Sequence, residues 1–268
     1  MFGKRLVSAV VLLSITGVAL VLGGYWLWML CLVAATLGCY EIMDLSGHRK
    51  NSLGVFTITA ALFYYLINLL EESSYNILYL LFCMVVLTGI FVFTYPQYQL
   101  KDVLIGSITL FYIPVMLCYA YMLRELPYGN WGIWLILIGA SGTDTFAYLC
   151  GKLFGKHHFS ELSPKKTIEG CIGGVLGTTC MFLLYAHFMP DAIFVNLVVS
   201  KYLYFAILGF FISVVAQIGD LCASAIKRHY DVKDFSHIIP GHGGVMDRLD
   251  SIVFVAPFAY YGMLFLVR

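Results

Sequence analysis

The chain is dominated by apolar segments that are long enough to cross a lipid bilayer. A helix needs about 20 mostly apolar residues to span the hydrocarbon core. The segments of the 268-residue sequence that come close to this length are 6–22, 25–45, 53–70, 76–95, 103–123, 131–150, 168–188, 202–222 and 251–267. Because backbone polar groups in lipid must be paired within the protein, each segment is expected to be helical. The sequence therefore predicts an all-α, polytopic integral membrane protein with about nine transmembrane helices.

The composition agrees with a protein whose main solvent is lipid. Hydrophobic residues make up 61% of the chain and charged residues 12%, whereas about a quarter of a soluble domain is charged. The formal net charge is +1, so the chain as a whole has no strong electrostatic attraction for nucleic acid. We expect no nucleic-acid partner, and any functional charge must be local.

The placement of lysine and arginine predicts the orientation of the helices. With a cytosolic N-terminus and nine alternating spans, 13 of the 16 basic residues fall on the cytosolic side and 3 on the other side. An excess of basic residues is typical of cytosolic loops. In a bacterial cell, this orientation would place the protein in the inner (plasma) membrane.

The charged residues gather in the second part of the chain. Residues 1–100 are expected to form about four transmembrane helices with few charges inside them, and residues 101–268 about five helices that form the catalytic region. Two cytosolic loops, 151–167 and 223–250, hold eight of the 13 basic residues assigned to the cytosol. These two loops are therefore the expected location of function.

The first candidate residue is Asp220, near the inner end of segment 202–222. A carboxylate at membrane depth is costly unless it is paired or hydrated, so it is a functional candidate. Gln217, Asp220, Ser224 and Lys227 follow one another at spacings of three, four and three residues, which places them on one helix face. The structural alternative is an ion pair between Asp220 and Lys227, two turns apart.

A second group of candidates lies before and at the start of segment 251–267. Asp247 and Asp250 are three residues apart and would lie near a helix N-terminus, where negative charge is favoured. Capping of the helix is therefore the alternative role, especially for Asp250. The preceding Pro-Gly-His-Gly-Gly stretch, 240–244, allows close approach of the backbone to a ligand, and exposed amides before a helix suit phosphate. Within it, His242 is a further candidate ligand or base.

The third group lies in loop 151–167 and in the segment before it. Ser163, Lys165 and Lys166 are close together, and lysines are compact donors for phosphate oxygens. The alternative is a basic anchor on the cytosolic side of the membrane, followed by a helix that starts at Thr167. Asp144 lies in the inner half of segment 131–150 and meets the same membrane-cost argument as Asp220.

Acidic side chains for a metal, basic side chains for phosphates and a glycine-rich loop are thus expected on the cytosolic side. Mg²⁺ in proteins is usually held by one or two carboxylates together with substrate phosphates. Phosphoryl-type transfer depends mainly on positioning and charge neutralisation. The residues therefore predict transfer of a nucleotide phosphate at the membrane surface, and they name neither the base nor the lipid.

The long pattern in residues 224–250 resembles the phosphatidate cytidylyltransferase (CDP-diacylglycerol synthase) family. The matching residues are Ser224, Lys227, Arg228, Lys233, Asp234, Ser236, Pro240, His242, Gly243, Gly244, Asp247, Arg248, Leu249 and Asp250. Upstream, Ser163-Pro164-Lys165-Lys166-Thr167 with Glu169-Gly170, and Asp144 with Tyr148, Gly151 and Lys152, also resemble the family. The first 100 residues match only in hydropathy.

This resemblance implies a reaction between CTP and phosphatidate that gives CDP-diacylglycerol and pyrophosphate. It also implies an Mg²⁺-dependent, all-helical and usually homodimeric enzyme, in which Asp220 and Asp247 hold a metal centre that includes a possible second ion. The expected catalytic residues are Asp220, Lys227, Arg228, Asp247 and Arg248. The expected substrate-binding residues are Asp144, Ser163, Lys165, Lys166, Ser224, Lys233, Asp234, His242, Gly243, Gly244 and Asp250.

Two other readings remain open at this point. One is a related lipid nucleotidyl- or phosphotransferase that uses another acceptor, such as an ether isoprenoid lipid or a polyprenol. The other is a transporter, because several spans with buried acids would allow one. A transporter usually carries polar groups across the whole membrane depth and often has paired repeats, whereas the polar residues here collect on one side.

Overall fold

The structure is a computed structural model that describes residues 2–70, 75–160, 162–195 and 197–267, with side chains from residue 6 onward. Eight helical segments are long and apolar enough to cross a membrane: α2 (Gly24–Leu45), α3 (Ser52–Leu69), α4 (Asn76–Thr94), Leu100–Glu125, Gly129–Phe154, α9 (Ile168–Phe188), α10 (Lys201–His229) and α11 (Met246–Val267). The chain is therefore a multi-pass integral membrane protein of nearly all-α fold. The segment predicted at 6–22 is helical within α1 (Phe2–Leu22), but its described apolar part, Leu6–Leu22, is shorter than the other spans. The ninth span and the orientation stay predictions.

Two of the spans are interrupted by a short π-helical segment. The fifth consists of α5 (Leu100–Leu110), η2 (Phe111–Val115) and α6 (Met116–Glu125). Pro114 lies inside η2, and a proline lacks the amide that a regular α-helix requires at this position. The sixth span consists of α7 (Gly129–Leu137), η3 (Ile138–Gly142) and α8 (Thr143–Phe154). The expected helices are present, and their local widening was not predicted.

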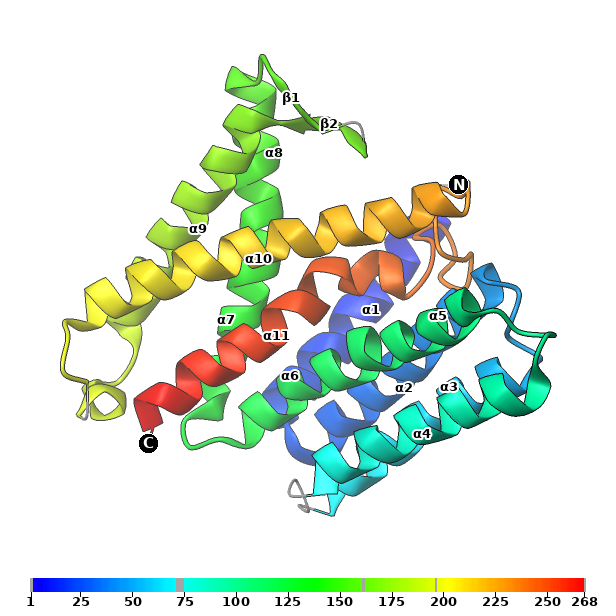
Figure 1. The fold of residues 1–268 in the computed structure, drawn as a ribbon. Helices are drawn as coiled ribbons and strands as arrows, with labels where there is room; N and C mark the ends of the chain where they lie inside the picture. The colour runs from blue at the N-terminus through cyan, green and yellow to red at the C-terminus, as the bar shows by residue number, and fades with distance from the viewer. Residues whose placement is uncertain (1, 71–74, 161, 196, 268) are drawn as a thin grey trace. The chain divides into compact units, whose positions relative to one another are not determined.

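A small β-hairpin departs from the all-helical expectation. It consists of β1 (His158–Ser160) and β2 (Ser163–Thr167), which pair antiparallel just before α9 (Figure 1). Thr167 ends β2 and caps α9, because its hydroxyl accepts a hydrogen bond from the Gly170 amide at 3.1 Å. The predicted helix start at Thr167 is confirmed, and the basic residues before it lie on a strand. A short 3₁₀ helix, η4 (Asp191–Phe194), precedes α10.

The chain divides into two compact units. Unit 1 contains Met1–Cys118 and Val232–Asp247, and unit 2 contains Tyr119–Asp231 and Arg248–Arg268. Residues 232–247 of predicted loop 223–250 thus group with the N-terminal helices, while the boundary expected after residue 100 stays a prediction. The functional candidates are accordingly described within each unit.

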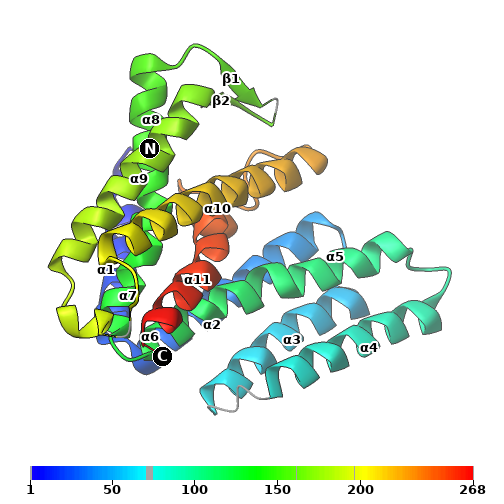
Figure 2. The same cartoon turned by 60° about the vertical axis from the view of Figure 1, so that its left-hand side comes forward.

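In unit 2, helix α9 packs closely against α8 and α10 (Figures 1 and 2). A Cβ atom on Gly177 would lie 2.2 Å from Cγ of Phe146 on α8, so only glycine allows this approach. The buried hydroxyl of Thr143 on α8 lies 3.0 Å from the hydroxyls of Thr178 on α9 and Ser213 on α10. Small residues and interhelical hydroxyl contacts are typical of membrane helix packing. Gly177 thus allows the close packing of α9 against α8.

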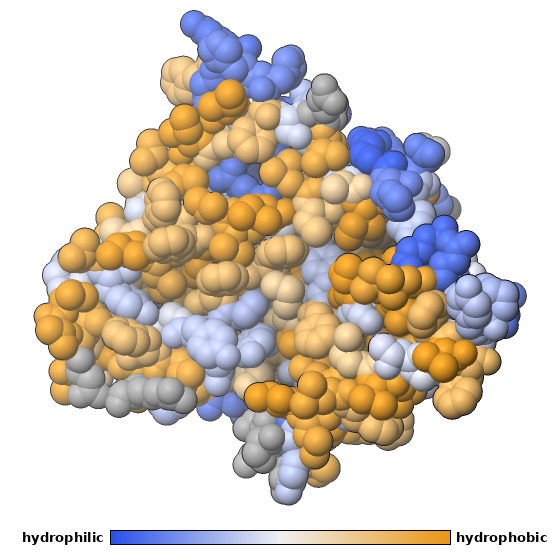
Figure 3. Space-filling view, in the orientation of Figure 1, coloured by the Kyte–Doolittle hydropathy of each residue, from blue (hydrophilic) through white to orange (hydrophobic). Residues whose placement is uncertain are grey.

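The surface of unit 2 separates into an apolar and a polar part. Hydrophobic side chains cover most of the visible surface along α9, whereas hydrophilic side chains gather at the end that carries β1 and β2 (Figure 3). Leu176 is 62% and Phe211 56% exposed. Large exposed apolar side chains on helices of this length are expected where the solvent is lipid.

In unit 1, α3, α4 and α5 share a hydrophobic core. Leu53, Leu87, Tyr98 and Val103 form one buried cluster within it. Two polar contacts also join these helices to α2 or to its following turn: the indole N–H of Trp28 donates to the Tyr65 carbonyl at 2.9 Å, and His48 lies 3.2 Å from Asp102. Residues 232–247 belong to the same unit as these helices.

Candidate functional site

The predicted polar face of α10 lies on one uninterrupted helix. Gln217, Asp220, Ser224 and Lys227 all belong to Lys201–His229, which extends past the predicted end of the segment at residue 222. Gln217 is buried, and its side-chain amide donates to the Cys171 carbonyl on α9 at 3.2 Å. Asp220, Ser224 and Lys227 are half-buried. The same face of α10 thus contacts α9 and carries the charged candidates.

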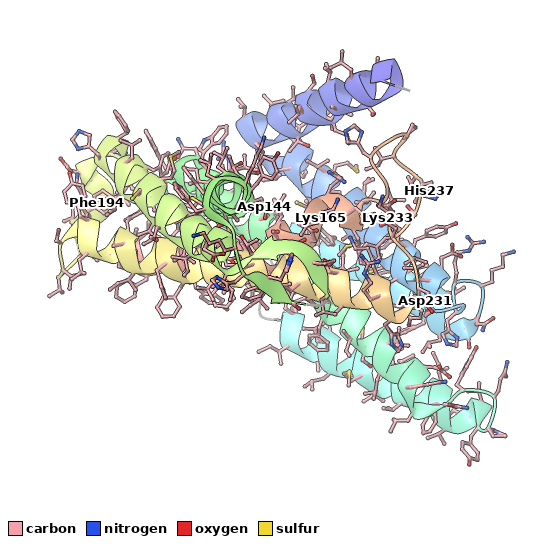
Figure 4. The ribbon with its side chains drawn as sticks, turned by 90° about the horizontal axis from the view of Figure 1, so that it is seen from above. Asp144, Lys165, Phe194, Asp231, Lys233 and His237 are labelled. Atoms are coloured by element: carbon pink, nitrogen blue, oxygen red, sulfur yellow. The ribbon has the colours of Figure 1, made fainter. Side chains whose placement is uncertain are left out.

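Asp220 forms an ion pair with Lys166 of β2. The two side chains are 25% and 19% exposed, so the pair is largely removed from solvent. The sequence analysis named Lys227 as the alternative structural partner of Asp220, and the structure shows an ion pair of Asp220 with Lys166, from the segment 151–167. The β1–β2 hairpin brings Lys166 to Asp220 on α10, whereas the neighbouring Lys165 is exposed (Figure 4).

Asp144, Asp220 and Asp250 form an acidic cluster in unit 2. The three carboxylates act electrostatically on one another, and Lys166 and Lys227 offset part of this repulsion. They come from three different helices: α8, α10 and α11. Like charges at this depth are costly unless cations or polar ligands accompany them. The cluster therefore combines three of the predicted acids with two of the predicted bases.

Unit 2 also contains the other predicted candidates from β2, α10 and α11. Ser163 on β2 is half-buried and aligned with Ser160 of β1, while Arg228 and Arg248 are exposed. Glu169, in the first turn of α9, binds the His157 side chain at 2.6 Å and accepts the Lys156 amide at 3.1 Å. Glu169 thus fixes the start of the hairpin.

In unit 1, the described residues 232–245, here called the signature loop, are organised by Asp247. Its Oδ2 atom accepts the backbone amides of Phe235 and Gly244, both at 2.9 Å. Gly243 has φ +82°, a left-handed conformation that favours glycine. A Cβ atom there would also lie 2.9 Å from Oδ2 of Asp247. The glycines of the loop therefore allow its backbone to close around the Asp247 carboxylate.

The helix that follows the loop begins earlier than expected. Helix α11 starts at Met246 and not at residue 251, so Asp247 lies in its first turn and Asp250 one turn later. Asp250 accepts the Ser251 amide at 2.8 Å. The Met246 amide, the first of α11, is bound by Glu41, and Asp250 lies in the second turn, so capping of this helix by Asp250 is not what the structure shows.

Glu41 of α2 was not recognised from the sequence, yet it is hydrogen-bonded to the signature loop and to the first residue of α11. Its carboxylate is fully buried and accepts the Ser236 hydroxyl at 2.5 Å, the Val245 amide at 2.8 Å and the Met246 amide at 2.9 Å. The amides expected to be exposed for phosphate belong to residues 240–244; of these, the Gly244 amide donates to Asp247, and Glu41 binds the two amides that follow. Glu41 is an acid inside predicted segment 25–45, so it is a functional candidate for the same reason as Asp220: a carboxylate at membrane depth is costly.

The N-terminal helix also contacts the loop. The hydroxyl of Ser8 on α1 donates to the Pro240 carbonyl at 2.9 Å and lies 2.9 Å from Nδ1 of His242. His242 is half-buried, whereas Lys233 and His237 are exposed on the loop (Figure 4). Asp234 is half-buried, and its Cβ atom would lie 3.4 Å from a Cβ on Gly243.

The predicted metal centre is divided between the units. Asp220 belongs to unit 2 and Asp247 to unit 1, so their joint binding of a metal stays a prediction. Within the described ranges, no group of three histidine, cysteine, aspartate or glutamate side chains is arranged to hold a metal ion. Magnesium sites with one or two carboxylates plus substrate phosphates do not require such a preformed group.

An apolar groove lies beside the charged end of α10. It has a volume of about 700 Å³ and runs between α9 and α10 within unit 2. Leu176, Ile207 and Phe210 contribute to its apolar lining, and Gln217 is at its polar part. Asp220 follows Gln217 by one turn of the same helix. Unit 2 therefore combines an apolar groove and a charged cluster along one helix.

Comparison with known proteins identifies the family. The profile of the Cytidylyltransferase family matches residues 3–266. A phosphatidate cytidylyltransferase of Thermotoga maritima is 33% identical over 84% of this chain and 82% of its own length, and one of Staphylococcus haemolyticus is 29% identical over 94% and 95%. The phosphatidate cytidylyltransferase of Bacillus subtilis is 42% identical over 59% of this chain, and the match spans 57% of that relative. The similarity includes the N-terminal helices as well as the C-terminal charged loops, and this chain belongs to the cytidylyltransferase family.

Proposed function

We propose that this chain is a phosphatidate cytidylyltransferase, which converts CTP and phosphatidate into CDP-diacylglycerol and pyrophosphate in phospholipid synthesis. The observation that carries this proposal is the family match across residues 3–266, together with relatives that bear this name. The structure is consistent with the substrates, because unit 2 has a charged cluster for phosphates and an apolar groove beside it. A lipid and a water-soluble nucleotide meet in such a site without either leaving its own phase.

The reaction replaces one phosphoanhydride bond at the α-phosphorus of CTP with another. An oxygen of the phosphatidate phosphate attacks the α-phosphorus of CTP and forms the new P–O bond. The bond from that phosphorus to the oxygen that bridges the α- and β-phosphates breaks, and the electron pair leaves with pyrophosphate. The nucleophile is already an anion, so the protein needs no strong general base. Its task is to position two anions and to neutralise their charge.

Basic side chains supply this neutralisation. We assign Lys165 and Lys166 to a substrate phosphate, since both lie on β2 and Lys166 already reaches a carboxylate beside the site. Lys227, Arg228 and Arg248 are assigned to the charge that develops on the transferred and leaving phosphates. On arrival of a substrate phosphate, Lys166 would exchange or share its contact with Asp220.

The remaining polar residues are assigned to substrate orientation. They are Asp144, Ser163, Ser224, Lys233, Asp234, His242, Gly243, Gly244 and Asp250. The amide of Gly244 is bound by Asp247, so contacts from this part of the loop would come from other atoms.

The donor chemistry suits Mg²⁺. Hard divalent cations prefer carboxylate oxygens, and the mutual repulsion of Asp144, Asp220 and Asp250 would be relieved by a bound cation. We assign Asp220 and Asp247 as protein ligands, with substrate phosphates completing the coordination and a second ion as an open option. When bound, the metal would offset charge on the triphosphate and on the pyrophosphate leaving group.

The cellular setting follows from the same reasoning. The excess of basic residues predicts that loops 151–167 and 223–250 face the cytosol, where CTP is present. In a bacterium, this places the enzyme in the inner membrane with a cytosolic active site. We further propose a homodimer, as the family resemblance implies.

The test is turnover by the purified protein in detergent micelles. Labelled CTP, phosphatidate and magnesium should give CDP-diacylglycerol and pyrophosphate in equal amounts. Replacing phosphatidate by a polyprenol or by an ether isoprenoid phosphate, and CTP by ATP, separates the related transferases from this assignment. A folded preparation that uses only another acceptor, or that forms no nucleotide–lipid product, would overturn the proposal.

A further inference from the structure

The signature loop is held by a carboxylate from the N-terminal half of the chain. Glu41 is 0% exposed and lies near the end of α2 (Gly24–Leu45). Among the described residues, it accepts three hydrogen bonds from the loop and the α11 start, and no basic side chain lies within ion-pair distance of it. A buried charge of this kind is costly unless its lone pairs are satisfied. The loop amides and the Ser236 hydroxyl satisfy them here.

The Glu41 carboxylate binds amides at the N-terminus of α11. Val245 and Met246 lie at the start of α11, and unpaired amides at a helix N-terminus carry partial positive charge. Glu41 therefore replaces the side-chain cap that most helices take from a neighbouring residue in sequence. Because the cap comes from a different membrane helix, it ties the start of α11 to α2.

An independent observation at Gly244 agrees with this arrangement. A Cβ atom on Gly244 would lie 2.6 Å from Oε1 and 2.9 Å from Oε2 of Glu41. The backbone at this position therefore approaches the carboxylate more closely than any other residue type would allow. The amide of the same glycine donates to Asp247 at 2.9 Å. Gly244 thus lies between the two carboxylates and contacts both.

We propose that Glu41 is a positioning residue for the reaction: it fixes the signature loop and the start of α11, and so fixes the place of the Asp247 carboxylate. The inference rests on the proposed function, because it takes Asp247 as part of the catalytic site. Glu41 itself touches neither substrate nor reacting atoms in this scheme. Residues 1–100, whose role the sequence left open, thereby supply a positioning element of the site.

The central variant is Glu41→Gln, which keeps the shape of the side chain. In glutamine, one of the two terminal oxygens is replaced by an NH₂ group, which donates and does not accept. The side chain then loses either the contacts now made by Oε1 or the contact now made by Oε2. Outer contacts that orient a catalytic group typically change activity by about 10–100-fold. We expect kcat to fall by this order while the KM for CTP changes less, because the loss is in the placement of Asp247.

The matched control is Asp44→Asn, one turn further along α2. Asp44 is also an acid, but its side chain is 54% exposed and pairs with Arg49 at 3.0 Å. The same acid-to-amide change should leave kcat within about twofold of wild type, as expected for a surface ion pair. A loss in Asp44→Asn as large as in Glu41→Gln would assign the effect to a general change in α2.

Hydrogen exchange gives a readout that does not depend on turnover. Amides in the peptide that covers residues 235–246 should exchange faster in Glu41→Gln than in wild type, whereas peptides of α9 and α10 should be unchanged. Faster exchange throughout the protein would indicate loss of fold and would overturn a specific positioning role. Unchanged exchange in the loop would overturn the proposal directly.

Two further variants keep the proposal testable if Glu41→Gln does not fold. Ser236→Ala removes one donor to Glu41 without altering α2, and should give a smaller loss of kcat with the same exchange pattern. Gly244→Ala places a methyl group against the Glu41 carboxylate, and should give a loss that is not additive with Glu41→Gln, because both act on one contact. Full additivity, or normal kcat in Ser236→Ala and Gly244→Ala, would overturn the inference.

The wild-type enzyme separates this inference from the proposed function. Absence of any cytidylyl transfer by a folded wild-type preparation would reject the proposed function, and loop exchange would still report whether Glu41 holds the loop. Normal turnover in wild type together with normal kcat and loop exchange in Glu41→Gln would reject the positioning role alone.

Discussion

The ammonium group of Lys166 on β2 is paired with the carboxylate of Asp220 on α10. The two residues are 54 positions apart in the sequence. Their pairing joins a predicted phosphate-binding element to a predicted metal ligand. Lys166 lies on β2, which pairs with β1 in an antiparallel hairpin just before α9. The hairpin thereby holds Lys166 beside α10.

Replacement of Asp220 by Asn should lower turnover by about 100-fold or more while the protein still reaches the membrane. The change removes the negative charge that faces Lys166 and the proposed metal, and the loss of one charge-stabilising group in an active site is of this order. The measurement is CDP-diacylglycerol formation by purified protein at saturating CTP. The control is Asp231→Asn, an exposed acid just beyond α10 whose φ of 53° asparagine also tolerates. Near-normal turnover in Asp220→Asn would remove Asp220 from the metal site.

The Lys166–Asp220 pair predicts that a second substitution can restore stability to Asp220→Asn without restoring its activity. Asp220→Asn removes the ion-pair partner of the buried Lys166 Nζ atom and leaves Asp144 as a nearby carboxylate. Loss of the ion-pair partner of a buried charge is destabilising. The double variant Lys166→Met/Asp220→Asn should therefore have a higher thermal unfolding midpoint than Asp220→Asn alone, yet remain inactive. A double variant that regains activity would contradict the catalytic assignment of both residues.

Replacement of Asp247 by Asn should abolish turnover without releasing the signature loop. The side-chain oxygen of asparagine can still accept from the amides of Phe235 and Gly244, whereas the charge for a metal is lost. Hydrogen exchange of the loop should therefore stay close to wild type in Asp247→Asn and increase in Asp247→Ala. Near-normal turnover in Asp247→Asn would leave this carboxylate with a structural role only.

Much of the fold was predictable because the bilayer restricts it. Each of the nine apolar segments is helical, and the predicted starts of α2, α3 and α4 lie within one residue of the observed ones. The π-helical segments and the hairpin were not predicted, because they depend on local backbone geometry that hydropathy does not report. Helix α11 starts five residues before the predicted position, since its first turn is polar and is stabilised by Glu41 rather than by lipid.

Site residues that lie on one helix could be predicted from their spacing, whereas contacts between distant segments could not. The spacing of Asp220 and Lys227 placed them on one helix face, but no local pattern indicates that Lys166 is the ion-pair partner. Glu41 escaped notice because its segment read as an ordinary span, and its partners are about 200 residues away in sequence. Only tertiary structure reveals such pairs, since sequence periodicity reports contacts within a helix.

Removal of Mg²⁺ should stop the reaction reversibly. Chelation should abolish formation of CDP-diacylglycerol and pyrophosphate together, and added magnesium should restore both with a saturable dependence. Asp220→Glu and Asp247→Glu keep the charge but move the oxygens, so any residual activity should need a higher magnesium concentration, because magnesium demands near-ideal geometry. Activity that persists at full rate in excess chelator would exclude the proposed metal role.

Close packing of α9 against α8 predicts a stability difference between two glycines. Gly177→Ala would place a methyl carbon 2.2 Å from Phe146 and force that ring to move, and overpacking of this kind costs about 1–3 kcal/mol. Gly89→Ala on α4 is the matched control, because its added Cβ meets nothing within 4 Å. We expect a lower thermal unfolding midpoint in detergent for Gly177→Ala and no decrease for Gly89→Ala. Equal unfolding midpoints for the two variants would mean that α8 and α9 can move apart at little cost. The hydroxyl contact between Thr143 and Thr178 would then contribute little to the stability of unit 2.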